Sequence, residues 1–158
     1  RNFRKAYGLF ISNGILFNHE SPRRGTNFVT AKVIKGALNI KKGYTDKLEM
    51  GNLDSYRDWG HSYDYTKAML KLLNHKNPED IVISTGKAYS VRELCEIVFK
   101  ELGLDYKDHI VIKQRFLRPQ ELPYLRGDSS KGRKMLNWNP EFTFRTLLLD
   151  MLKHFEKE

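Results

Sequence analysis

Short apolar runs suited to β-strands alternate along this chain with longer segments whose apolar residues recur at helical spacing. Strands are predicted over residues 8–17, 80–84 and 109–113, with a shorter candidate over 47–50. The first run is mostly apolar between polar residues, which is typical of a strand buried on both faces of a parallel sheet. Strands separated by helices of this length predict an α/β fold built of βα units.

Four amphipathic helices are expected between and after these strands. They cover residues 28–42, 65–74, 91–102 and 144–155. Ser90 and Glu93 form a capping box, because the hydroxyl and the carboxylate can each satisfy one unpaired backbone N–H of the first turn. Gly43 and Gly103 follow the ends of two helices, and Thr143 is a candidate cap for the last.

The chain has no internal repeat, no low-complexity tract and no linker rich in Ser, Gly or Pro, so one unit over residues 1–158 is expected. At 158 residues and 40% hydrophobic content it is long enough to bury a core. A strand over residues 8–17 that is buried on both faces needs parallel neighbours and covering helices that no preceding residues supply. The chain is therefore expected to start within a domain.

Several function classes have no support in the composition. No run approaches the about 18 consecutive apolar residues of a membrane span, and residues 1–5 lack the apolar segment of a signal peptide. A cytoplasmic protein with no membrane partner is expected. Cys95, the single cysteine, lies in a helical apolar pattern and is expected to be a buried core thiol. The histidines are scattered without metal-ligand spacing, so no metal site is expected.

The formal charge of +9 and the pI near 9.6 indicate phosphate-bearing partners. Charge alone leaves nucleic acid, nucleotides and a merely solvated basic surface open. The basic residues form short separate groups instead of one tail or one helix face. This distribution favours several small anionic ligands over one continuous nucleic-acid backbone.

Phosphate-binding and nucleophile motifs are weak or absent. The glycines never form G-x-G, and Gly127 and Gly132 have only the outer spacing of a P-loop. Arg133 and Lys134 replace the Lys-Ser/Thr pair, and no buried strand directly precedes the segment, so a turn at the start of a helix is preferred. No G-x-S-x-G sequence supports nucleophilic hydrolysis.

Residues 18–25, Asn-His-Glu-Ser-Pro-Arg-Arg-Gly, directly follow the first predicted strand. Open α/β sheets bind ligands at the carboxyl ends of their strands. An amide, an imidazole and two guanidinium groups supply donors and positive charge suited to ribose hydroxyls, a carboxamide and phosphates. From composition alone, a polar loop with solvated arginines remains the alternative.

Ordered segments from end to end resemble the GDP-mannose 4,6-dehydratases, a family of extended short-chain dehydrogenases/reductases. The segments are residues 15–25, 27–30, 51–54, 57–61 with Asp64-Tyr65, Arg118-Pro119 with Glu121, Gly127-Asp128 and 136–138. The resemblance implies the C-terminal, nucleotide-sugar-binding portion of a Rossmann-like fold. This portion comprises the last strands and helices of the parallel sheet and the small substrate-binding domain. The N-terminal dinucleotide-binding portion would be absent from this chain.

The resemblance also implies a function. Family enzymes are NADP-dependent lyases that convert GDP-mannose to GDP-4-keto-6-deoxymannose and water, at the start of the route to GDP-fucose. The residues expected to contact NADP are His19, Arg23 and Arg24. Those expected to contact GDP-mannose are Asn18, Val29, Lys32, Arg57, Arg118 and Glu121. The resemblance places no catalytic residue in this chain, which alone is expected to be inactive, and implies a homo-oligomer, a dimer or tetramer, for the full-length protein.

Two features invite functional interpretations that the pattern does not favour. Tyr63 and Lys67 spell the Tyr-x-x-x-Lys of a coenzyme-activating pair, but they follow the strand of another βα unit and are expected together on a helix surface. Trp59 and Trp138 are expected to pack as large buried rings.

Alternatives remain open for Arg57 and for the whole chain. Arg57 has a structural alternative, a salt bridge with Asp54, Asp58 or Asp64. The charge and the abundant aromatic residues also suit a basic nucleic-acid-binding module. A further alternative is a non-catalytic oligomerisation fragment of a related nucleotide-sugar epimerase or dehydratase.

Overall fold

The structure, a computed structural model, describes residues 1–117 and 119–157. Arg118, one of the residues expected to contact GDP-mannose, lies outside the described residues. No helix among those described is long and apolar enough to cross a membrane.

Helices and short strands alternate along the chain. The helices are α1 (Asn2–Tyr7), α2 (Val29–Lys41), α3 (Ser62–Leu73), α4 (Val91–Glu101), α5 (Tyr106–His109), α6 (Ser130–Leu136) and α7 (Phe144–Phe155), with a 3-10 turn, η1, at Gln114–Phe116. The strands are β1 (Asn13–Leu16), β2 (Asn18–Glu20), β3 (Leu48–Met50), β4 (Tyr56–Arg57), β5 (Trp59–His61), β6 (Asp80–Ile83), β7 (Tyr89–Ser90), β8 (Ile110–Ile112) and β9 (Tyr124–Leu125). All four predicted helices and all four predicted strand regions are present.

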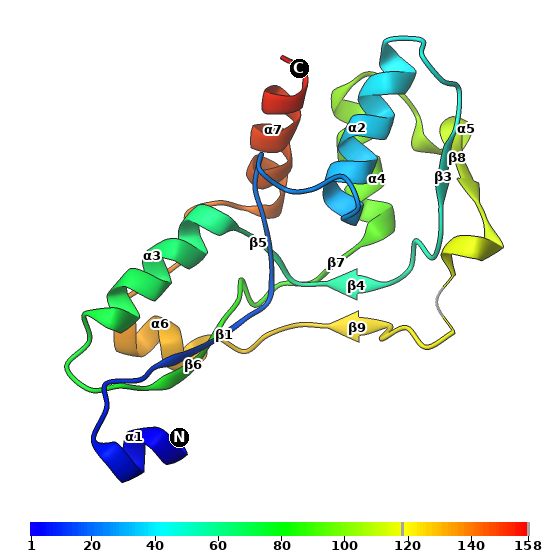
Figure 1. Cartoon of the computed structure of the whole chain (residues 1–158). Helices are drawn as coiled ribbons and strands as arrows, with labels where there is room; N and C mark the ends of the chain where they lie inside the picture. Colours follow the sequence, from blue (N-terminus) through cyan, green and yellow to red (C-terminus); the bar gives the residue numbers. More distant parts are fainter. Residues whose placement is uncertain (118, 158) are drawn as a thin grey trace.

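The strand pairing is mainly parallel, which confirms the predicted α/β class. β1 pairs with β6, β2 with β5, and β3 with β8, each in parallel, while β4 lies between antiparallel β7 and parallel β9. Figure 1 shows α1, β1, β6, α3 and α6 at one end of the molecule. Helices α2, α4 and α7 lie at the other end with β3 and β8, and β4 and β9 run between the two ends.

The first strand is shorter and more exposed than predicted. β1 begins at Asn13 instead of residue 8, because α1 ends at Gly8 in the left-handed region (φ 62°) and the chain reaches Asn13 without pairing. Ile15 is 55% exposed, and β6 is the one strand paired with β1 among the described residues. The prediction of burial on both faces is therefore wrong for this chain as described.

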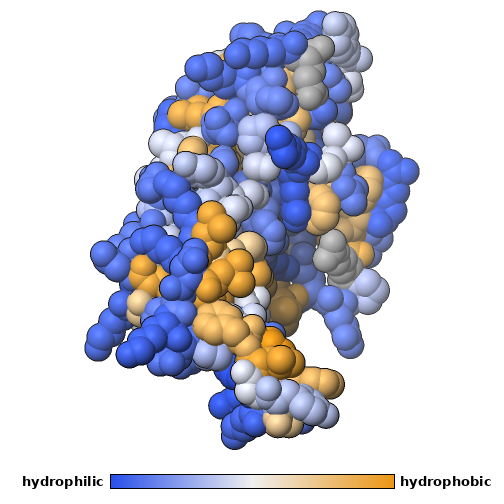
Figure 2. Space-filling view, turned by 60° about the vertical axis from the view of Figure 1, so that its left-hand side comes forward, coloured by the Kyte–Doolittle hydropathy of each residue, from blue (hydrophilic) through white to orange (hydrophobic). Residues whose placement is uncertain are grey.

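Apolar side chains from α1 and the segment around β1 remain at the surface. Figure 2 shows apolar surface gathered low on the molecule, above α1. The large exposed apolar residues of this region are Phe3, Tyr7, Leu9, Phe10 and Ile15. We call them the α1–β1 surface.

The main core lies between α2, α4 and α7, whose inward side chains form one cluster. The predicted caps form as expected: Ser90 Oγ accepts from Glu93 N at 3.1 Å, Glu93 Oε2 accepts from Ser90 N at 2.7 Å, and Thr143 Oγ1 accepts from Thr146 N. Cys95 is fully buried in this core, and burial raises the pKa of its thiol to about 12. The prediction of a buried core thiol is confirmed. A second, smaller cluster lies between α3, β6 and α6.

Candidate functional site

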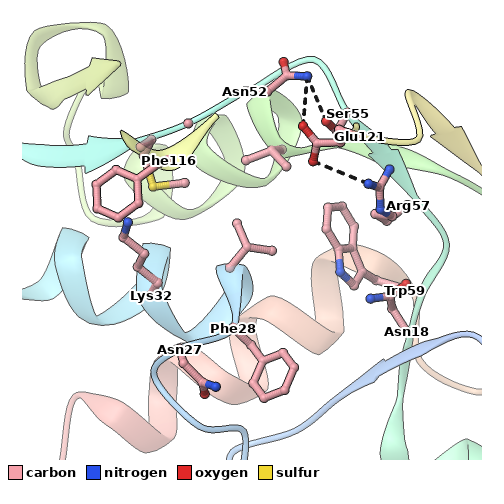
Figure 3. Close-up of a pocket in the computed structure, with 14 residues that line it drawn as sticks. Asn18, Asn27, Phe28, Lys32, Asn52, Ser55, Arg57, Trp59, Phe116 and Glu121 are labelled. Carbon is pink, nitrogen blue, oxygen red and sulfur yellow. Dashed lines mark hydrogen bonds and ion pairs between the residues drawn. The ribbon is translucent and has the colours of Figure 1, made fainter. Parts of the chain in front are cut away.

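A cavity of about 350 Å³, here called the cleft, opens between the start of α2 and strands β2, β4 and β5 (Figure 3). Its lining residues are Asn18, Asn27, Phe28, Val29, Lys32, Met50, Gly51, Asn52, Ser55, Arg57, Trp59, Val91, Phe116 and Glu121. Of the six residues predicted to contact GDP-mannose, five line it: Asn18, Val29, Lys32, Arg57 and Glu121. The structure therefore brings together every member of the set that it describes.

Local chain geometry places these side chains. Asn18 follows the carboxyl end of β1, as predicted, and begins β2, where its Cα is the register partner of Trp59 on β5. Val29 and Lys32 lie about one turn apart at the start of α2 and therefore share a face. Arg57 ends β4, and Glu121 precedes β9, which pairs with β4.

Two nitrogens of the Arg57 guanidinium group donate hydrogen bonds to oxygen atoms of the protein. Its Nη1 donates to the carbonyl oxygens of Tyr56 and Leu122, each at 2.7 Å. Its Nη2 lies 3.5 Å from Glu121 Oε1, and both side chains are largely buried. Arg57 therefore fastens the segment before β9 onto β4, and Glu121 partly neutralises its charge.

None of the three acids considered as alternative partners pairs with Arg57. Asp54 pairs with Arg92 at 2.9 Å, Asp58 accepts from backbone N–H groups, and Asp64 accepts from Phe142 N at 3.0 Å. The proposed salt bridge to one of them is wrong. Its partner is Glu121, which lies 64 residues away in sequence and belongs to the predicted substrate set.

Glu121 also accepts a hydrogen bond on its other oxygen. Asn52 Nδ2 donates to Glu121 Oε2 at 3.2 Å and to Ser55 Oγ at 3.0 Å. Figure 3 shows Asn52, Ser55, Glu121 and Arg57 as one connected group along the upper wall of the cleft. This polar wall offers amide, hydroxyl and carboxylate groups to a ligand with both donors and acceptors.

Lys32 differs from Arg57 because it makes no salt bridge with a described residue. Its Nζ lies 3.8 Å from the centroid of the Phe116 ring, and Figure 3 shows the two side chains together at one end of the cleft. Burial lowers the pKa of Lys32, Arg115 lowers it further, and Glu49 opposes both effects. A bound anion would relieve the cost of keeping this ammonium charged.

Both tryptophans pack as predicted. Trp59 is 1% exposed and stacks on Phe144 with ring centroids 5.3 Å apart. Trp138 is 3% exposed and donates from Nε1 to the carbonyl oxygen of Asp64 at 2.9 Å. Trp59 nevertheless also lines the cleft, a position that the packing prediction did not give it.

A second, smaller hollow adjoins the cleft. It is lined by Leu16, Phe17, Asn18, His19, Arg24 and Leu125, so Asn18 borders both cavities. Two of the three residues predicted to contact NADP, His19 and Arg24, therefore lie together. Arg23 is exposed and lies outside this lining.

His19 and Arg24 are each oriented by neighbouring groups. His19 Nδ1 lies 2.9 Å from the carbonyl oxygen of Phe17, which assigns that nitrogen as the donor and leaves Nε2 as the other polar atom of the ring. Arg24 Nε lies 3.0 Å from Glu20 Oε2 as an ion pair. The guanidinium carbon is 3.3 Å from the Phe28 ring centroid.

Glu20 anchors this group from inside the protein. It is 1% exposed and accepts a hydrogen bond from Thr30 Oγ1 at 2.6 Å, in addition to its ion pair with Arg24. Burial raises the pKa of Glu20, while Thr30 and Arg24 lower it by a smaller amount. The carboxyl group ties the loop after β2 to the first turn of α2.

The raised pKa of Glu20 predicts a pH-dependent stability. The Glu20 carboxyl group binds its proton more tightly in the folded chain than in the unfolded chain. The contribution of this proton to stability is therefore fully present below the ordinary pKa of 4.5 and is lost as pH rises through the raised pKa. Relative to Glu20→Gln, which does not titrate, the wild type should lose stability over that range. Urea denaturation between about pH 4 and pH 8 measures the difference, and a constant difference would contradict the prediction.

Two segments that resemble functional motifs in sequence, the Tyr63–Lys67 pair and residues 127–132, lie outside the cleft lining. Lys67 Nζ is 4.4 Å from the Tyr63 ring centroid and 2.6 Å from Glu141 Oε1, which confirms a pair on the surface of α3. Gly127 precedes the turn into α6, and its N–H donates to Asp58 Oδ2, so the preference for a helix-start turn over a P-loop is confirmed.

Several lining residues were not predicted as site residues. Asn27, Phe28, Gly51 and Asn52 lay within segments that resemble the family, which was a usable signal. Phe116 carried none. It reaches the cleft because η1 passes so close to Gly51 that a Cβ there would lie 2.4 Å from the Phe116 carbonyl oxygen.

Residues 1–151 match the sequence model of the family described as GDP-mannose 4,6 dehydratase. GDP-mannose 4,6 dehydratase 1 of Arabidopsis thaliana is 46% identical over 151 residues, covering 96% of this chain and 42% of the relative. The human GDP-mannose 4,6 dehydratase is 42% identical over 168 residues, covering 96% of this chain and 45% of its own. The chain thus spans less than half the length of these relatives.

Solved structures share the fold over nearly the whole chain. RMD from Pseudomonas aeruginosa, complexed with NADPH, superposes with a TM-score of 0.90 at 25% identity and covers 99% of this chain and 52% of that one. A dTDP-glucose 4,6-dehydratase from Bacillus anthracis, in complex with NAD, gives 0.86 at 22% identity, covering 99% and 48%. The predicted Rossmann-like class is confirmed by the fold, and the matched family model and relatives show that this chain belongs to the GDP-mannose 4,6-dehydratase family.

Proposed function

We propose that this chain supplies the sugar-nucleotide site of a GDP-mannose 4,6-dehydratase and binds GDP-mannose in the cleft. One observation carries the proposal: the residues selected from sequence come from β2, α2, β4 and the segment before β9, yet they line one cavity. The names of the curated relatives supply the substrate class.

The cleft has groups for each part of such a ligand. Lys32, which makes no salt bridge within the described ranges, supplies a positive charge for the diphosphate, and Arg57 adds a second, partly neutralised one. Glu121 and Asn52 suit ribose hydroxyls or guanine N–H groups. By the family resemblance Arg118 belongs to the same set.

The adjoining hollow is proposed as part of an NADP site. The His19 imidazole and the Arg24 guanidinium fit phosphate oxygens or a carboxamide, and Arg23 supplies a further exposed guanidinium beside them. RMD, which has this fold, is complexed with NADPH. When bound, the cofactor would accept and return a hydride. This chain's part is to orient the sugar, through Asn18, at the border between the two cavities.

The whole protein is proposed to convert GDP-mannose to GDP-4-keto-6-deoxymannose and water, in the cytoplasm and as a homo-oligomer. Acid and base groups would come from a dinucleotide-binding portion outside these 158 residues. The apolar α1–β1 surface and the single described partner of β1 support docking of a further α/β portion there. Alone, the chain is expected to bind without turnover.

Isothermal titration calorimetry with GDP-mannose tests the binding proposal. We expect saturable heat from GDP-mannose and clearly weaker binding of UDP-glucose, because the curated relatives are named for GDP-mannose. Equal affinity for both sugars, or no heat from either, would contradict it. Tighter binding of single-stranded DNA, with an affinity that falls linearly on a log–log salt plot, would favour the nucleic-acid alternative.

A further inference from the structure

The indole N–H of Trp59 has no hydrogen-bond partner among the described residues. Its Nε1 is buried, although the ring itself is well packed against Phe144. An unpaired buried donor destabilises the folded state, so such donors are rare in folded proteins and call for an explanation. Packing explains the ring of Trp59 but does not explain its nitrogen.

The position of this nitrogen points to a ligand. Trp59 lines the cleft, and the β2–β5 register sets it directly beside Asn18. Figure 3 shows the indole nitrogen at the end of the ring nearest the Asn18 carboxamide. That carboxamide also makes no hydrogen bond with any residue in the described ranges. Two neighbouring side chains therefore present unused N–H donors at one end of the cleft.

This end of the cleft adjoins the second hollow. Asn18 borders both cavities, whereas Lys32 and Phe116 lie at the opposite end in Figure 3. In a hydride-transfer enzyme the reacting sugar must lie next to the cofactor. A sugar nucleotide in the cleft would therefore direct its hexosyl-diphosphate end, which is rich in acceptor oxygens, toward Trp59 and Asn18.

We propose that the Trp59 indole N–H, together with the Asn18 carboxamide, donates hydrogen bonds to oxygen atoms of the hexosyl diphosphate and selects for that end of the substrate. This inference rests on the proposed function. It gives Trp59 a binding role in addition to its packing role.

Trp138 offers a matched control. It is as buried as Trp59, but its Nε1 already donates to Asp64 and it lies outside the cleft lining. Trp59→Phe and Trp138→Phe remove the same atoms. Trp59→Phe breaks no hydrogen bond within the described protein, whereas Trp138→Phe removes the hydrogen bond to the carbonyl oxygen of Asp64, so Trp138→Phe should lower the midpoint of urea denaturation more. Trp59→Phe should instead weaken GDP-mannose binding about tenfold.

An NMR titration of the ¹⁵N-labelled chain observes the two indole N–H groups directly. The two variants assign the signals. We expect GDP-mannose to shift the Trp59 signal and leave the Trp138 signal in place. GMP, which lacks the β-phosphate and the hexose, should shift backbone signals around the cleft without moving the Trp59 indole.

Each outcome decides between the inference and the proposed function. If GDP-mannose shifts backbone signals of the cleft but not the Trp59 indole, the indole inference is overturned and the proposed function stands. If GMP moves the indole as much as GDP-mannose does, the assignment to the hexosyl-diphosphate end is wrong. If GDP-mannose moves no signal, both proposals fail.

Discussion

Asp58→Ala is expected to lower the free energy of unfolding by about 3–5 kcal/mol. Asp58 is fully buried. Its carboxylate accepts from Thr85 N and Gly86 N at 2.9 Å, from Gly127 N at 3.2 Å and from Thr85 Oγ1 at 2.5 Å. Alanine would leave three backbone N–H groups without the acceptor that they share.

Because Asp58 lies in the chain between two residues that line the cleft, its replacement should affect ligand binding as well as stability. It stands between Arg57 and Trp59, and its hydrogen bonds hold the turn after β6 and the segment before α6 against the β4–β5 connection. Asp58→Asn keeps one acceptor oxygen and should lose less stability than alanine. Both variants should loosen the wall of the cleft, so binding of GDP-mannose should weaken in parallel with stability.

Urea denaturation of the wild type and both variants measures the effect. Asp54→Ala is the matched control, because the Asp54 side chain is 71% exposed and pairs with Arg92 at the surface. A surface ion pair of this kind contributes about 0–1 kcal/mol. If Asp58→Ala and Asp54→Ala cost the same, the carboxylate of Asp58 is not the central acceptor that its contacts indicate.

The helices were predictable because their signals are local. Periodicity located α2, α3, α4 and α7, and the side-chain caps at Ser90 and Thr143 were identified from sequence. Strands of two residues, such as β4 and β7, have no such signal, since neither spacing nor alternation can be read from two residues. Their pairing is a product of tertiary structure.

The exposure of β1 was mispredicted for a related reason. Its apolar sequence is compatible with burial on both faces, but burial depends on which neighbours are present. In the described structure β6 is the one strand beside it, so Ile15 meets solvent. A sequence pattern reports what a strand can bury and does not report what covers it.

For the cleft too, the sequence predicted some of the residues, whereas their long-range contacts could be found only in the structure. The family resemblance selected Asn18, Lys32 and Arg57, and the fold brings them to one cavity. The Arg57–Glu121 pair spans 64 positions, so the partner could not be identified from spacing. The Trp59 N–H, which lacks an acceptor in the part of the chain that the structure describes, could not be recognised either, because a sequence gives the donor and only the structure shows whether it has an acceptor.

The structure also changes which cation is expected to matter most for binding. Two nitrogens of Arg57 donate to protein carbonyl and carboxylate oxygens, whereas Lys32 makes no salt bridge with the described residues. Replacing Arg57 would disturb the wall of the cleft as well as the ligand. Replacing Lys32 isolates the contribution of one charge to binding.

Lys32→Met is therefore expected to weaken GDP-mannose binding by about 10- to 100-fold, the loss of one charge-assisted contact to a diphosphate, with little change in stability. Calorimetric titration measures the affinity. Lys41→Met is the control, because Lys41 lies exposed at the end of the same helix and outside the cleft lining. Equal affinities for the two variants would reject a direct role for Lys32.

The pH dependence of binding gives a second, independent test of the same group. Burial lowers the pKa of Lys32 in the free chain, and a bound diphosphate favours its charged form and raises the pKa again. The complex then holds the proton more tightly than the free chain, so affinity should fall as pH rises through the lowered pKa. Lys32→Met has no proton to lose there, so its affinity should stay flat over the same range. A parallel decline in wild type and variant would assign the titration to another group.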